Sequence, residues 1–259
     1  MISKLRIKAA FRASSIHLVG SLVVAALAAA LVFVCWYPYP YRELAGGREL
    51  FLIVVSVDVI CGPLLTAVLF NPSKPRAELW RDLGMVVLIQ FAALGYGLYS
   101  VWQARPLFLV MEKDRFKVVA APDLQGESAL RQLNALPQAL RAGLWSGPVV
   151  VAIREPVDTK ERNTVLFESI QGGRDYALRP EFYLPYQGAD ALKSVPRSKP
   201  LSVFLTKQPT QQLAAQALAT EKGADMAKWL YVPVVGRKDW VAILNSQGHI
   251  EGFLPGDGF

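Results

Sequence analysis

Three long apolar runs precede a region of ordinary mixed composition. They cover residues 16–36, 50–70 and 83–101, so each is about 19–21 residues long. Runs of this length span the hydrocarbon core of a bilayer, about 30 Å thick, as α-helices. The pattern predicts a membrane protein with a three-helix membrane domain over residues 1–101. A second domain is expected over residues 102–259.

The first run resembles a secretory signal peptide only at its basic start. The apolar part of such a peptide is usually about 7–15 residues long and ends at small residues. This run is longer, and it ends in the aromatic segment 36–41, Trp-Tyr-Pro-Tyr-Pro-Tyr. Aromatic residues of this kind mark a membrane–water interface. We therefore expect the first run to be retained as a spanning helix.

The distribution of Lys and Arg predicts the orientation of the three helices. Four basic residues and no acid precede the first run, whereas the loop at 71–82 holds three and the loop at 38–49 holds two. Loops rich in Lys and Arg stay in the cytoplasm. We therefore expect a cytoplasmic amino terminus and an extracytoplasmic carboxy-terminal domain.

Residues 102–259 show the alternation and turn signals of a mixed α/β domain. A helix is expected at 128–136, another from an Asp158–Glu161 capping box to Gly172–Gly173, and a third from Thr210 to Gly223. Residues 173–208 suggest an extended connection or interaction surface. Strands are expected at 105–111, 115–120, 147–153, 230–235, 240–244 and 249–254.

Composition limits the possible chemistry. The net charge of +7 is spread over 28 basic and 21 acidic residues, and no basic stripe with interleaved aromatics indicates nucleic-acid binding. The chain has two histidines and two cysteines, and both cysteines fall within the apolar runs. We therefore expect no disulfide in the second domain, no catalytic residues, no metal site and no cofactor.

An acid in the second apolar run is the first candidate for function. Asp58 lies roughly 12 Å along the helix from the start of that run. An ionised carboxylate at such a position costs about 2.5–3.5 kcal/mol unless it finds a partner or water. Gly62 and Pro63 follow one turn later, and proline removes a backbone donor and weakens the helix.

Two interpretations of Asp58 stay open. Asp58 can hold the bundle together by bonding Gln90, Tyr96 or Ser56, or it can receive a polar or charged group from another membrane protein. A proton or ion pathway is less favoured, because three helices with a single acid make a poor transporter.

The membrane half contains a series of short motifs in a fixed order, which include Trp36-Tyr37-Pro38, Val57-Asp58, Cys61-Gly62-Pro63-Leu64-Leu65-Thr66, Gln90, Ala93-Leu-Gly-Tyr96-Gly97 and Arg105-Pro106. With these motifs the chain resembles the TfpX/TfpZ family of type IV pilin accessory proteins over about residues 5–120. The resemblance implies an inner-membrane accessory, without catalytic activity, that is needed for assembly or stability of a cognate type IV pilin.

Such a protein would have the pilin subunit as its partner, through both the membrane helix and the head domain of the pilin. The lipid bilayer and other pilus assembly proteins are further expected partners, and the second domain would be periplasmic. Two alternatives are a membrane-anchored ligand-binding sensor and a membrane-bound modifying enzyme. The cytoplasmic parts lack an output module, which counts against the sensor. The enzyme would need convergent polar residues, which the sequence does not supply.

Overall fold

The computed structural model describes residues 4–124, 127–171 and 174–259, which form two compact units. The helical unit contains the chain up to Cys35 together with Gly47–Gln103. The α/β unit contains Trp36–Gly46 together with Ala104–Phe259. The short segment between the first two membrane helices therefore belongs to the α/β unit, whereas the residues on either side of it in the sequence belong to the helical unit.

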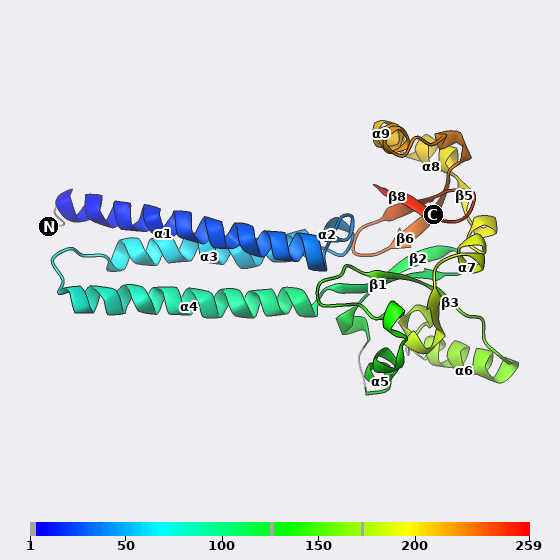
Figure 1. Cartoon of the computed structure of the whole chain (residues 1–259), viewed down its shortest axis with the longest axis horizontal. Coiled ribbons are helices and arrows are strands. Elements are labelled where there is room, and N and C mark those ends of the chain that lie inside the picture. Colours follow the sequence, from blue (N-terminus) through cyan, green and yellow to red (C-terminus); the bar gives the residue numbers. More distant parts are fainter. Residues whose placement is uncertain (1–3, 125–126, 172–173) are drawn as a thin grey trace. The chain divides into compact units, whose positions relative to one another are not determined.

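Three helices make up the core of the helical unit (Figure 1). They are α1 (Lys4–Ala30), continued by the π-helical turn η1 (Leu31–Trp36), α3 (Gly47–Leu69) and α4 (Arg76–Gln103). Helix α3 contacts both α1 and α4. Among the described residues, these are the helices long and apolar enough to cross a membrane, so the predicted three-helix membrane half is confirmed. Helices α1 and α4 begin well before the apolar runs, because their charged flanking residues also favour helix.

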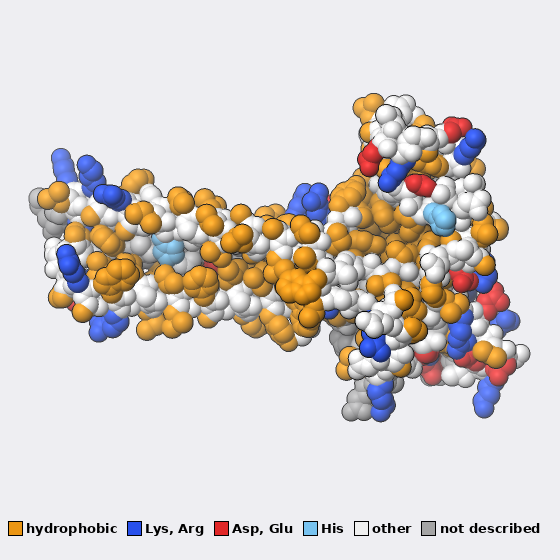
Figure 2. Space-filling view, viewed as in Figure 1, with side chains coloured by type: hydrophobic (Ala, Val, Ile, Leu, Met, Phe, Trp, Pro, Cys, Tyr) orange, Lys and Arg blue, Asp and Glu red, His pale blue; other side chains and the backbone are white. Residues whose placement is uncertain are grey.

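The surface of the helical unit is apolar. Leu27, Val68 and Leu88, one from each helix, have exposed fractions of 69%, 69% and 65%. Figure 2 shows hydrophobic side chains along the helices, with basic groups gathered near the amino-terminal end. Exposed apolar surface of this extent is unfavourable in water and matches lipid. The helical unit thus has the surface of a membrane anchor.

The α/β unit is built on a mixed sheet. Its strand order is β4-β3-β1-β2-β6-β7-β8, and β5 pairs with β6 off this path. The pairs β1/β3 and β2/β6 are parallel, and the other neighbours are antiparallel. The strands are β1 (Pro106–Glu112), β2 (Arg115–Ala120), β3 (Val149–Ile153), β4 (Tyr183–Pro185), β5 (Lys199–Pro200), β6 (Leu230–Val235), β7 (Trp240–Leu244) and β8 (Ile250–Pro255).

Side chains alternate between the two faces of the β6–β7 hairpin, as a strand requires. Tyr231 and Ile243 belong to one core cluster, with residues of α8 (Leu201–Lys207) and α9 (Gln212–Lys222). Val232 and Ala242 belong to a second cluster, with residues of α2 (Tyr41–Leu44). The two faces are thus covered by different parts of the chain. The helices of this unit are α2 (Tyr41–Leu44), α5 (Glu127–Ala135), α6 (Thr159–Ile170), α7 (Ala189–Leu192), α8 (Leu201–Lys207) and α9 (Gln212–Lys222).

The mixed α/β class is confirmed, and two local predictions are wrong. Thr210 does not cap a helix: it lies in a 3-10 turn, Pro209–Gln211, and α9 begins only at Gln212. Pro209 suits the first position of such a turn, since its φ is fixed. The interval 173–208 is not merely extended, because α8 buries Leu201 and Phe204 at helical spacing. Helix α6 ends at Ile170, and the predicted stop at Gly172–Gly173 lies outside the described residues.

Candidate functional site

A cavity of about 290 Å³ lies among the three membrane helices. Helix α3 contributes Asp58 and α4 contributes Gln90, while α1 contributes His17. The remaining lining residues are small or apolar: Gly20, Ser21, Val24, Val87 and Phe91. Polar groups at membrane depth are expensive and face the bundle interior or a partner. Each of the three helices thus contributes one strongly polar side chain to this cavity.

Pro63 lies inside the continuous helix α3, and a side chain of α1 bonds to it. The Ser14 hydroxyl donates to the Pro63 carbonyl oxygen at 2.8 Å. One turn further along α1, His17 Nδ1 lies 2.5 Å from the hydroxyl oxygen of Thr66, which is 3% exposed. Ser and Thr hydroxyls commonly satisfy backbone groups near prolines in membrane helices. These two contacts fix α1 against α3 beside the cavity.

Gln90 ties α4 to α3 on the other side of the cavity. Its Nε2 donates to the backbone carbonyl oxygen of Asp58 at 2.9 Å. A β-carbon on Gly62 would lie 2.1 Å from that same Nε2, so a larger residue at this position would displace the Gln90 side chain from this arrangement. Gln90 Oε1 is buried and accepts no hydrogen bond from the described residues. The cavity therefore holds the half-buried Asp58 carboxylate beside an unsatisfied amide acceptor.

The structure brings together four of the residues that the sequence singles out around the acid. Asp58, Gly62, Pro63 and Gln90 lie in one neighbourhood, as the preceding distances show. Tyr96 lies elsewhere, with 75% of its side chain exposed.

Sequence reasoning did not include His17 in this site. It lies thirteen residues after the start of α1 and near the beginning of the first apolar run. Ser14 and Ser21 are the residues that could have indicated its role, because they lie three residues before His17 and four after it. Positions at this spacing share one face of a helix. A polar stripe on an otherwise apolar helix indicates the face that packs inward.

The family-pattern residues at 36–38 lie in the α/β unit. Trp36 Nε1 donates to the carbonyl oxygen of Leu144 at 3.0 Å. The Pro38 ring packs so closely on Gly147 that a β-carbon there would lie 2.6 Å from Pro38 Cγ. Further along the segment, Leu44 is fully buried in the second core cluster. The segment Trp36–Gly46 is therefore a structural part of the α/β unit.

Tyr37 is buried beside two arginines. It is 1% exposed, and burial raises the pKa of its phenol well above the ordinary value, against the opposing charges of Arg237 and Arg105. Burial likewise lowers the pKa of the Arg105 guanidinium. Pro106 follows Arg105 directly and opens β1, where it pairs with Ala120. Trp36 and Pro38 thus contact residues just before β3, Tyr37 lies beside Arg105, and Pro106 belongs to the sheet. None of these five residues lines the membrane cavity.

Among the residues that the structure describes, no group of three or more His, Cys, Asp or Glu side chains is placed to hold a metal ion. Cys35 and Cys61 are free thiols. The polar contacts around the cavity are therefore hydrogen bonds, and Asp58 contributes a carboxylate to its lining.

Comparisons with known proteins give a consistent relationship. A family model described as "Fimbrial assembly protein FimB" matches residues 5–46. The serogroup I fimbrial assembly protein of Dichelobacter nodosus is 33% identical over 264 residues, covering 100% of this chain and 99% of that protein. Its serogroup E1 counterpart is 32% identical with the same coverage. The serogroup C1 and C2 protein is 40% identical over 138 residues, covering 53% of this chain. No solved structure matches the chain.

Proposed function

The chain belongs to the family of fimbrial assembly proteins, and on that premise we propose that it is an inner-membrane accessory for a cognate type IV pilin. It acts by binding the pilin subunit before assembly rather than by catalysis. The relatives are named for fimbrial assembly and align with this chain over its whole length. A membrane anchor joined to an α/β unit suits a subunit that has both a membrane helix and a head domain.

The single observation that carries this proposal is the cavity beside two acceptor groups, the Asp58 carboxylate and Gln90 Oε1. Both groups are able to accept hydrogen bonds, and the amide oxygen has no donor within the described residues. A buried acceptor left without a donor costs about 1–3 kcal/mol. A partner helix that brings an N–H or ammonium donor to the cavity removes that cost. The partner is therefore a membrane segment with a donor group, as a pilin helix with its amino-terminal ammonium would be.

The proposal includes an orientation. We place the amino terminus and the α3–α4 loop in the cytoplasm, and the α/β unit in the periplasm. Four basic residues lie at the start of the chain and three in that loop. In this arrangement the α/β unit is on the side where the pilin head lies.

Replacing Asp58 separates partner binding from structural support. Asp58→Asn keeps the shape and the hydrogen bonding but removes the charge, whereas Asp58→Leu removes both. If Asp58 receives a cationic donor from the pilin, both variants lose piliation while the abundance of the protein stays normal. Piliation is measured by electron microscopy and abundance by immunoblotting of membranes.

Tyr96→Phe is the matched control, because it alters a polar group on the exposed side of α4. It should leave piliation and abundance unchanged. If Asp58→Asn has normal piliation and Asp58→Leu has low abundance, Asp58 only supports the bundle. Asparagine would then be tolerated because interhelical hydrogen bonds average only about 0.6 kcal/mol. Normal piliation with Asp58→Leu at normal abundance contradicts any role for this residue.

A further inference from the structure

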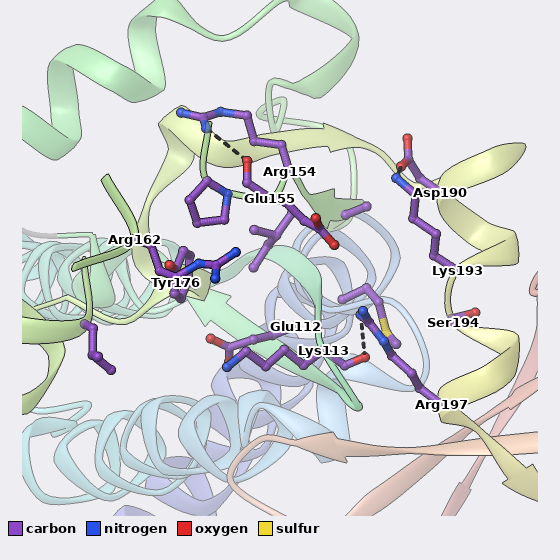
Figure 3. A pocket seen from close by; sticks show the side chains of 15 residues that line it. Glu112, Lys113, Arg154, Glu155, Arg162, Tyr176, Asp190, Lys193, Ser194 and Arg197 are labelled. Carbon is purple, nitrogen blue, oxygen red and sulfur yellow. Dashed lines mark hydrogen bonds and ion pairs between the residues drawn. The ribbon is translucent and has the colours of Figure 1, made fainter. Parts of the chain in front are cut away.

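A pocket of about 450 Å³ opens in the α/β unit at the carboxyl ends of the parallel strands β1 and β3 (Figure 3). Met111 and Ala152, the last paired residues of the two strands, form part of its lining and are 6% and 5% exposed. Ile153 and Leu166 add further apolar surface. Crevices at the carboxyl ends of parallel strands are frequent ligand sites. This pocket lies entirely within the α/β unit and takes no part in the membrane cavity.

Charged side chains surround the apolar lining. Two of the cations are paired within the protein: Arg154 binds Glu161 with two bonds of 2.8 and 2.9 Å, and Lys193 binds Asp190 at 2.8 Å. Three further cations line the pocket and have no carboxylate partner among the described residues: Lys113, Arg162 and Arg197. Besides Asp190, the acids in the lining are Glu112 and Glu155. The unpaired groups therefore leave an excess of positive charge.

The three unpaired cations come from separate segments. Lys113 lies in the β1–β2 turn, Arg162 on α6, and Arg197 in the 3-10 turn after α7. The side chain of Arg197 donates to the Lys113 carbonyl oxygen at 3.3 Å, which holds these two segments together. Figure 3 shows Arg162 beside Tyr176, on the side of the pocket opposite Lys193 and Arg197. A ligand that enters the pocket would meet cationic groups on both sides.

An exposed apolar stripe continues from the pocket along α6. Leu166 lies four residues after Arg162 and Ile170 four residues after Leu166, so the three share one face of the helix. The exposed fractions of Leu166 and Ile170 are 52% and 72%, and that of the neighbouring Phe167 is 61%. Clustered apolar side chains on the surface of a folded unit mark interaction sites more often than single ones do.

We propose that this pocket and the α6 stripe together bind a protein segment in which an acidic side chain is followed by apolar ones. The acid enters the pocket and pairs with the guanidinium of Arg162, a geometry that carboxylates match with two hydrogen bonds. The apolar residues of the segment cover Leu166 and Ile170. The occupant is a protein segment rather than a small anion, because the stripe extends beyond the pocket along the helix.

The inference rests on the proposed function for the identity of the partner, which is the head domain of the cognate pilin. The head is the part of the pilin outside the membrane, where the α/β unit is proposed to lie. Charge complementarity of this kind sets the association rate and the specificity of a complex. Head binding should therefore weaken when salt screens the cationic rim.

Binding is measured with the full-length protein in nanodiscs and two probes, full-length pilin and the pilin head without its membrane helix. The pocket variants are Arg162→Glu and the pair Leu166→Ser with Ile170→Ser. The matched controls on α9 are Lys222→Glu and Leu213→Ser, the latter at a side chain 78% exposed. Thermal unfolding of every variant verifies that it is folded.

The head should bind the wild type, and each pocket variant should weaken that binding about tenfold or more. The α9 controls should bind as the wild type does. Raising NaCl from about 0.05 M to about 0.5 M should weaken head binding to the wild type more than to Arg162→Glu.

Two outcomes overturn the inference while the proposed function stands. In one, full-length pilin binds but the head alone does not. In the other, the head binds and the pocket variants match the α9 controls. If neither full-length pilin nor the head binds the wild type, the proposed function fails and this inference fails with it.

Discussion

Substituting alanine for Gly97 tests the close packing of α3 against α4. A β-carbon at position 97 would lie 2.3 Å from Val54 Cγ1 and 3.1 Å from Cγ2. Valine has a stiff χ1 torsion, so the clash cannot be relieved by rotating the side chain. The helices must separate, and overpacking of this kind costs about 1–3 kcal/mol. Gly95, two residues earlier on the same helix, has no atom within 4 Å of such a carbon.

The pair of variants isolates the packing cost. Both substitutions gain the same helix propensity, about 1 kcal/mol for alanine over glycine. Gly97→Ala should therefore have a free energy of unfolding lower than that of Gly95→Ala by about 1–3 kcal/mol. Gly62→Ala should fall between them, because Gln90 can rotate away and only one interhelical hydrogen bond, about 0.6 kcal/mol, is lost. Reversible unfolding in mixed micelles, followed by helical circular dichroism, measures the difference. Equal stability of the 97 and 95 variants would refute the α3–α4 contact.

Three further predictions concern the rest of the molecule. Arg154 and the Val157 backbone N–H lower the pKa of the Glu161 carboxyl from its ordinary 4.5 to about 2. The contribution of this carboxylate to stability is therefore complete above about pH 4.5 and is lost as the pH falls toward 2. Thermal unfolding of Glu161→Gln should lack this part of the pH dependence. Leu44→Ala, at a fully buried position, should destabilise the α/β unit by about 2–5 kcal/mol in chemical denaturation. Reporter fusions after Phe70 and after Val101 should report cytoplasm and periplasm respectively, and the reverse result would overturn the proposed orientation.

The sequence predicts the helical unit well because its apolar runs carry a strong signal. The length of each run alone separates a spanning helix from other structures. The contact of Gln90 with Asp58 is also predictable from the sequence, since few polar residues occur in these runs. The pairing of Ser14 with Pro63 is not predictable, because it depends on the rotation of α1 about its axis. That rotation follows from packing rather than from hydropathy.

In the α/β unit, the strands are predictable from the sequence, but the segments that pack against the faces of the sheet are not. The runs at Leu230–Val235 and Trp240–Leu244 have the β-branched and aromatic composition of strands. Nothing local indicates that Leu44 fills the core on one face of this hairpin, since the two segments are almost 190 residues apart in the chain. A segment of eleven residues between two membrane helices is normally interpreted as a loop.

For the pocket beside α6, too, the sequence predicts the local features of the helix but not the direction in which they face. Asp158 caps α6 as predicted, since its Oδ1 accepts from the Glu161 backbone N–H at 2.7 Å. The Glu161 side chain does not complete a capping box, because it bonds the Val157 N–H and Arg154 instead. The spacing of Arg162, Leu166 and Ile170 is visible in the sequence. Whether that stripe faces the core or the solvent depends on the position of β3 and is known only from the fold.

Site-specific photo-crosslinking in native membranes tests pilin binding at the cavity most directly. A photoreactive residue is placed at Val87, which lines the cavity, and at Ile89, which helical geometry places on the other side of α4. In cells that produce the cognate pilin, the residue at 87 should form a covalent adduct with pilin, and the residue at 89 should not. An absence of pilin adduct at 87, or equal adducts at both positions, would contradict binding of the pilin helix at this cavity.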